Sequence, residues 1–149
     1  MKNQKVILVI DDDENIQIAV QDILESAGYS VRICGDGKEG FRAIEKRDFD
    51  LALCDIVMSD MDGMEFLRRL KKAGHDMPVI IMSGNQVGIK FVNSAQLLGA
   101  RTTLVKPLAH GAKRVRSGQA TPESAGHRIA GGRGDLTFGD TIESYSTTQ

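Results

Sequence analysis

The chain has 149 residues, a length that suits one globular domain with a sizeable hydrophobic core. Its formal net charge of −1 at pH 7 excludes a general electrostatic attraction to nucleic acid or to an anionic membrane. The apolar run near the N-terminus is stopped by three aspartates, so it is too short for a signal-peptide core or a membrane span, and we expect a cytoplasmic protein.

Short apolar runs recur along the chain and are separated by longer amphipathic stretches. Their unbroken apolar character is typical of strands that are buried on both faces of a parallel sheet. Cys34 and Cys54 fall within these runs, and in a cytoplasmic protein we expect them to be reduced, small apolar side chains rather than a disulfide. The runs predict strands at residues 6–10, 30–34, 51–54, 79–82 and 102–105.

The stretches between the predicted strands carry helical periodicity. After the first strand an apolar stripe with intervals of three or four residues ends at Gly28, and it consists of Ile16, Val20, Ile23 and Ala27. Similar stripes predict helices at residues 37–46, 63–73 and 87–98. The alternation of strand and helix predicts a doubly wound α/β fold.

Polar groups stand at the C-terminal ends of four of the apolar runs. In an open parallel sheet, the crevice beyond these strand ends is where ligands bind. We therefore expect a cluster of carboxylates, one hydroxyl and one ammonium group at a single edge of the sheet. In chain order, the cluster consists of Asp11, Asp12, Asp13, Asp55, Ser83 and Lys106.

The last part of the chain, residues 109–149, is rich in Gly, Ser, Thr and Ala. Gly111 and Gly118 bracket a short stretch in which Val115 is the one large apolar residue, so a fifth helix should be weak or irregular. We expect a compact domain at 4–108 and a tail at 109–149 that packs only through Val115 and is otherwise flexible. The sheet face left bare would favour self-association or a partner's helix.

Taken together, these motifs resemble the CheY-like receiver domain of two-component response regulators. The resemblance spans about residues 5–108 and depends on the acidic triplet, on Asp55 with the segment up to Gly63, on Ser83 with the glycine after it, and on Lys106 with the proline after it. It implies a flavodoxin-like, five-stranded parallel sheet of order 2-1-3-4-5. It also implies a phosphoacceptor, not an enzyme with a separate substrate.

The resemblance implies a role for each carboxylate. Asp55 is the phosphoacceptor, since a strand-end carboxylate can attack phosphorus and become an acyl phosphate. Mg²⁺ is the expected cofactor because it prefers oxygen ligands. By position in the receiver pattern, Asp12 binds the ion directly, Asp11 binds it through water, and Asp55 and the backbone carbonyl of Val57 complete the set.

The resemblance also assigns the two remaining polar groups. Lys106 supplies positive charge to the phosphoryl oxygens, and Ser83 is the switch hydroxyl that moves toward them. Pro107 is expected to follow a cis peptide bond that aims Lys106 inward. Two departures from the pattern are Ser59, where receivers usually have proline, and Thr103, where many carry an aromatic residue that reorients with the switch.

The implied partners are a sensor histidine kinase or phosphotransfer protein as the donor and an unknown output protein. Neither nucleic acid nor a membrane is expected as a partner, and a homodimer remains an open alternative.

Other function classes fit the sequence less well. A phosphatase of the haloacid-dehalogenase type also uses an aspartyl phosphate, but it requires an Asp-x-Asp-x-Thr/Ser stretch, and the segment that starts at Asp11 lacks the hydroxyl. Turnover of a phosphate ester would distinguish the two. A receiver-shaped scaffold that is never phosphorylated, or a receiver cut off from an output domain, remains open. A dinucleotide-binding module is disfavoured, because no glycine-rich turn follows the first strand.

Overall fold

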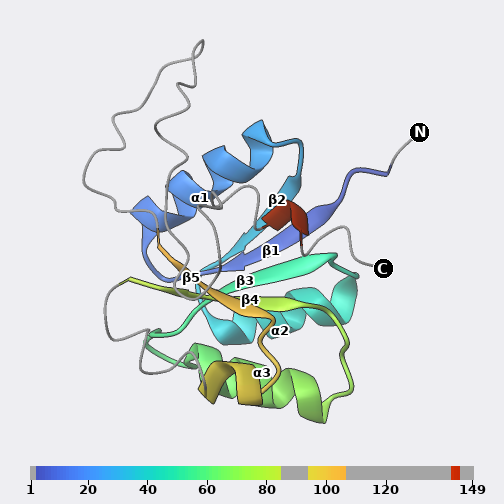
Figure 1. The fold of residues 1–149 in the computed structure, drawn as a ribbon, viewed down its shortest axis with the longest axis vertical. Helices are drawn as coiled ribbons and strands as arrows, with labels where there is room; N and C mark the ends of the chain where they lie inside the picture. The colour runs from blue at the N-terminus through green and yellow to red at the C-terminus, as the bar shows by residue number, and fades with distance from the viewer. Residues whose placement is uncertain (1–2, 85–93, 107–141, 145–149) are drawn as a thin grey trace.

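The structure of the protein is a computed structural model, which describes residues 3–84, 94–106 and 142–144. A five-stranded parallel sheet lies at its centre, with the strand order β2-β1-β3-β4-β5 (Figure 1). This confirms the predicted fold class and strand order. The strands are β1 (Val6–Ile10), β2 (Ser30–Cys34), β3 (Leu51–Asp55), β4 (Val79–Ser83) and β5 (Thr102–Val105).

Two strands are one residue longer than the apolar runs indicated. The ladder extends through Asp55, which pairs with Met82, and through Ser83, which pairs with Val105. Backbone hydrogen bonding tolerates a polar residue at the last position of a strand, so the apolar run ended before the strand did. Both polar side chains are therefore held by regular sheet structure rather than by a loop.

Within the described residues, three helices of ten or more residues flank the sheet, and an aspartate precedes each of them as its N-cap. They are α1 (Glu14–Ser26), α2 (Gly37–Lys46) and α3 (Gly63–Lys72), and a further helical turn covers residues 94–97. The side chains of Asp13, Asp36 and Asp62 accept hydrogen bonds from amides in the first turns, which satisfies N–H groups that a helix start leaves unpaired. None of the helices in the described part of the chain is long and apolar enough to cross a membrane.

The helices form two layers, one on each face of the sheet (Figure 1). On one face α1 packs through Ile16, Val20 and Leu24. On the other face α2 and α3 pack through a cluster that includes the fully buried Phe66, whose ring meets Phe41 edge to face at 5.7 Å between centroids. The strands β1, β3 and β4 are therefore covered on both faces, as their continuous apolar sequences require, whereas in β2 only Cys34 is buried.

Among the described residues of the C-terminal segment, 142–144, Ile142 belongs to the core. Ile142 is 0% exposed and packs in the same apolar cluster as α1, although the sequence predicted that Val115 alone would pack from this segment. The prediction was wrong at this position because an isolated isoleucine among Gly, Ser and Thr carries no periodic signal. The predicted turn around Val115 lies outside the described residues.

Shortening Ile142 should destabilise the fold. We expect Ile142→Ala to lower the free energy of unfolding by about 2–5 kcal/mol, because a buried isoleucine leaves a cavity when it is truncated. Ile18→Ala is the matched control, since Ile18 is 57% exposed and its truncation should change stability by only about 0.5 kcal/mol. Urea unfolding of both variants is the measurement, and equal midpoints would show that Ile142 is not packed in solution.

Candidate functional site

The C-terminal ends of four strands bring the predicted polar residues to one edge of the sheet. Asp55 is the last residue of β3 and Ser83 the last residue of β4, while Asp11 directly follows β1 and Lys106 directly follows β5. The amide of Lys106 donates to the carbonyl oxygen of Ser83 at 2.7 Å, which joins the ends of β4 and β5.

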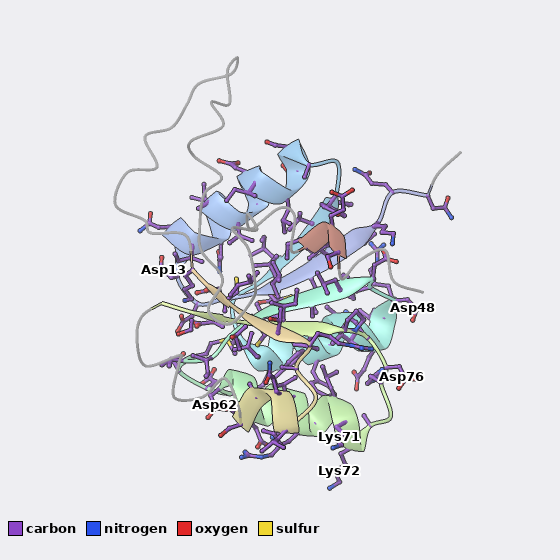
Figure 2. The ribbon with its side chains drawn as sticks, viewed as in Figure 1. Asp13, Asp48, Asp62, Lys71, Lys72 and Asp76 are labelled. Atoms are coloured by element: carbon purple, nitrogen blue, oxygen red, sulfur yellow. The ribbon has the colours of Figure 1, made fainter. Side chains whose placement is uncertain are left out.

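Figure 2 places the N-caps of α1 and α3, Asp13 and Asp62, at this same edge, and Asp48 and Asp76 at the opposite edge. Helices α1 and α3 therefore start beside the cluster of polar residues, where their N-terminal amides and positive dipole ends favour negative charge.

The start of α3 lies against the end of β3 at very short range. The amide of Gly63 donates to the carbonyl oxygen of Ile56 at 3.0 Å. A Cβ atom at position 63 would overlap the carbonyl oxygen of Asp55 and lie 3.1 Å from the Cα of Ile56. Only glycine allows this approach, so Gly63 fixes the backbone that carries the Asp55 side chain.

A single ammonium group links two buried carboxylates at the centre of the site. The Nζ of Lys106 lies 2.8 Å from Oδ2 of Asp11 and 2.9 Å from Oδ2 of Asp55. Asp11 is 0% and Asp55 3% exposed, so neither charge is well hydrated. Two desolvated anions are tolerated here because they share one cation.

The pKa values of Asp55 and Lys106 reflect the opposing effects of burial and of charge pairing. Burial raises the pKa of Asp55 most strongly; the Lys106 ammonium opposes that effect and the nearby Asp11 adds to it, so the pKa lies above the usual value. Burial lowers the pKa of Lys106, but its pairing with Asp11 and Asp55 outweighs burial and leaves the pKa above the usual value. Lys106 is therefore a firmly held cation.

The site has an excess of negative charge and an arrangement that fits a divalent cation. Asp11, Asp12 and Asp55 each offer a carboxylate oxygen, and these oxygens lie within 4.8 Å of one another. Three carboxylates and one ammonium leave a formal excess of two negative charges. Within the described residues, Oδ2 of Asp11 is also the one buried side-chain oxygen without a well-oriented hydrogen bond. Oxygen ligands and uncompensated charge suit Mg²⁺.

The sequence also singled out Val57, Thr103, the peptide bond before Pro107 and a helix at 87–98. Val57 follows β3, and its amide donates to Oδ1 of Asp55 at 3.3 Å. Thr103 lies in β5 and is buried. The predicted cis bond before Pro107 and most of the predicted helix at 87–98 fall outside the described residues.

Sequence reasoning missed one contact at the site. The side-chain amide of Gln17 on α1 donates to the carbonyl oxygen of Asp11 at 2.5 Å. No motif marks a glutamine at this position, and its only sequence signal is its place one helical turn after the N-cap.

A family model for the response regulator receiver domain matches residues 7–115. The chain belongs to the response regulator receiver family. Members of this family are phosphoacceptors rather than classical enzymes, and they require a phosphodonor partner. The family, the fold and the phosphoacceptor function predicted from the sequence are thereby confirmed.

Curated relatives share the receiver but are much longer. The transcriptional regulatory protein ZraR of Escherichia coli O157:H7 is 35% identical over 102 residues, which cover 68% of this chain and 23% of ZraR. The DNA-binding transcriptional regulator NtrC of Rhizobium meliloti is 38% identical over 101 residues, which cover 68% of this chain and 21% of NtrC. The chain thus spans less than a quarter of the length of these relatives.

Solved structures of receivers match the fold. A CheY-like response regulator receiver domain protein from Methanospirillum hungatei has a TM-score of 0.62 at 35% identity, with 71% of this chain and 84% of that chain covered. The chemotaxis protein CheY4 of Vibrio cholerae has a TM-score of 0.65 at 28% identity, with coverage of 71% and 89%.

Adding a methyl group at Gly63 should disturb both stability and the site. We expect Gly63→Ala to lower the free energy of unfolding by about 1–3 kcal/mol, because the backbones of α3 and β3 must separate. Gly35→Ala is the matched control, since a Cβ there would meet only a side-chain oxygen of Glu39 at 3.7 Å. Chemical unfolding measures the effect, and a Gly63→Ala protein as stable as the control would contradict this account of the turn.

Proposed function

We propose that Asp55 is the residue that accepts the phosphoryl group, within a receiver domain at residues 4–108 that is followed by a tail at 109–149. The observation that carries this assignment is the position of the Lys106 ammonium, 2.9 Å from Oδ2 of Asp55, in a cluster with two further carboxylates. From the described residues, Oδ1 of Asp55 accepts only a long hydrogen bond, 3.3 Å from the amide of Val57, and it is the oxygen available to react.

In the proposed reaction, a carboxylate oxygen of Asp55 attacks the phosphorus of a phosphohistidine. The new O–P bond forms as the P–N bond breaks, and the leaving imidazole keeps the electron pair and takes up a proton. Lys106 pairs with a phosphoryl oxygen, and the hydroxyl of Ser83 donates to another. Transfer of this kind depends on positioning and charge neutralisation, which these groups supply from the ends of the adjacent strands β3, β4 and β5.

The residues that would hold Mg²⁺ are Asp12 directly, Asp11 through a water molecule, and Asp55 with the backbone carbonyl of Val57. When bound, the ion neutralises charge on the phosphoryl oxygens. The exposed side chain of Asp12 leaves room for the water molecules that Mg²⁺ retains.

The proposed donor is the phosphohistidine of a sensor histidine kinase or phosphotransfer protein. Movement of Ser83 toward the phosphoryl group would shift the populations of two states of the end of β4, and an output protein would bind one state more tightly. The names of the relatives describe DNA binding and transcriptional regulation by much longer chains. For this chain we propose a cytoplasmic protein partner, without nucleic acid or membrane contact, and a homodimer remains an alternative.

Removing the proposed phosphoacceptor should abolish phosphorylation. Incubation with acetyl phosphate and Mg²⁺ should add one phosphoryl group to the wild-type mass and none to Asp55→Asn, because an amide oxygen does not form the acyl phosphate. Asp60→Asn is the control, since Asp60 is an exposed aspartate in the loop that follows β3. Intact-mass spectrometry measures the gain, and labelling of Asp55→Asn at the wild-type level would refute the assignment.

Removing the Lys106 ammonium should make the stability of the fold depend more strongly on Mg²⁺. Without Mg²⁺, we expect Lys106→Met to lower the free energy of unfolding by about 3 kcal/mol, because Asp11 and Asp55 lose their shared cation. Saturating Mg²⁺ should recover a larger part of the stability in the variant than in the wild type, since the ion binds only the folded cluster. Thermal unfolding with and without Mg²⁺ tests this, and an equal gain in both proteins would show that the ion does not bind beside Lys106.

A further inference from the structure

Asp12 is the least supported of the three clustered carboxylates. Its side chain is exposed, and within the described residues it makes no hydrogen bond or ion pair. Asp11 and Asp55, by contrast, both contact the ammonium of Lys106. Like charges within 4.8 Å of one another repel, so an unrestrained Asp12 would turn away into solvent. Its direction must come from the backbone on either side of it.

Two hydrogen bonds restrain that backbone, one on each side of Asp12. The peptide before it is held at the carbonyl of Asp11, which accepts from Nε2 of Gln17 at 2.5 Å. The peptide after it is held at the amide of Asp13, which donates to Oδ1 of Asp11 at 2.9 Å. Because the two peptide planes set the direction of the Asp12 Cα–Cβ bond, both contacts bear on where its carboxylate points.

The side chain of Gln17 reaches back from α1 to the peptide that precedes Asp12. The backbone amide of Gln17 donates to the carbonyl oxygen of Asp13 at 3.0 Å, so the residue lies one turn into α1, and its side chain folds back over that turn. The Asp13 side chain meanwhile caps α1 by accepting from the amides of Asn15 and Ile16. The segment Asp11–Asp13 is thus bound to α1 at both of its ends. The Asp13 end is joined through the helix N-cap, and the Asp11 end is joined through the side chain of Gln17.

We infer that Gln17 is a positioning residue that keeps Asp12 directed toward the cation position between Asp11 and Asp55. This role rests on the proposed function, since it presumes that the cluster binds Mg²⁺. Gln17 itself touches neither the ion nor the phosphoryl group in this scheme. It supplies one neutral hydrogen bond to a peptide carbonyl that lies beyond the end of β1. A partner of this kind behind a metal ligand typically changes metal affinity by 10–100-fold.

The test is a Mg²⁺ titration of the whole 149-residue chain, monitored by NMR of the amides at residues 11–13. Gln17→Met keeps the length of the side chain and removes the donor. Gln21→Met is the matched control on the same helix, because Gln21 also donates one hydrogen bond, to Oε1 of Glu25 at 2.9 Å, on the exposed surface. Unfolding of each variant without Mg²⁺ provides the second measurement, which reports any purely structural role.

We expect Gln17→Met to weaken Mg²⁺ binding about tenfold, and Gln21→Met to leave it unchanged. A purely structural role would lower the unfolding midpoint of Gln17→Met while the folded protein still bound Mg²⁺ at wild-type affinity, and that result would overturn the inference. If wild type binds Mg²⁺ and Gln17→Met binds it equally well, Gln17 is not a positioning residue and the phosphoacceptor proposal stands. If wild-type amides at residues 11–13 do not respond to Mg²⁺ at all, the proposed cation site fails and this inference fails with it.

Discussion

The ion pair that Lys106 forms with both Asp11 and Asp55 is the interaction on which the site depends. Two carboxylates that are almost fully buried would otherwise lie unpaired at the sheet edge, and an unpaired buried charge is among the most destabilising features a protein can contain. One ammonium cannot neutralise three carboxylates, so the cluster retains an excess of negative charge. That excess is the physical basis for the proposed binding of a divalent cation.

The fold creates this cluster through constraints that act on the backbone. Parallel pairing places the ends of β1, β3, β4 and β5 at one edge, because each of these strands runs in the same direction. Gly63 allows α3 to begin directly against the carbonyl of Asp55, and Asp13 caps α1 beside the acidic loop. The charged side chains are therefore held by regular elements on several sides, which limits how far they can move apart.

The sequence was most informative about features that depend on residues adjacent along the chain. Apolar runs located the strands to within one residue, because this signal comes from neighbours along the chain. The strand order came from resemblance and not from periodicity, since pairing is a long-range property. Gln17 and Ile142 carried no signal, because the value of each depends on a partner that only the folded chain brings near. The same holds for Lys106, whose simultaneous contact with two aspartates no spacing could predict.

The proposed phosphorylation would change which anions the Lys106 ammonium contacts. A phosphoryl group on Asp55 would offer the Lys106 ammonium further anionic oxygens, which would compete with its present contacts to Asp11 and Asp55. The backbone amide of Lys106 donates to the carbonyl of Ser83, which makes the ends of β4 and β5 respond together when the side chain moves. The hydroxyl of Ser83 would gain a new acceptor at the same time. On this view the switch is a redistribution of buried charge at the sheet edge, and the ends of β4 and β5 are the elements that would respond to it.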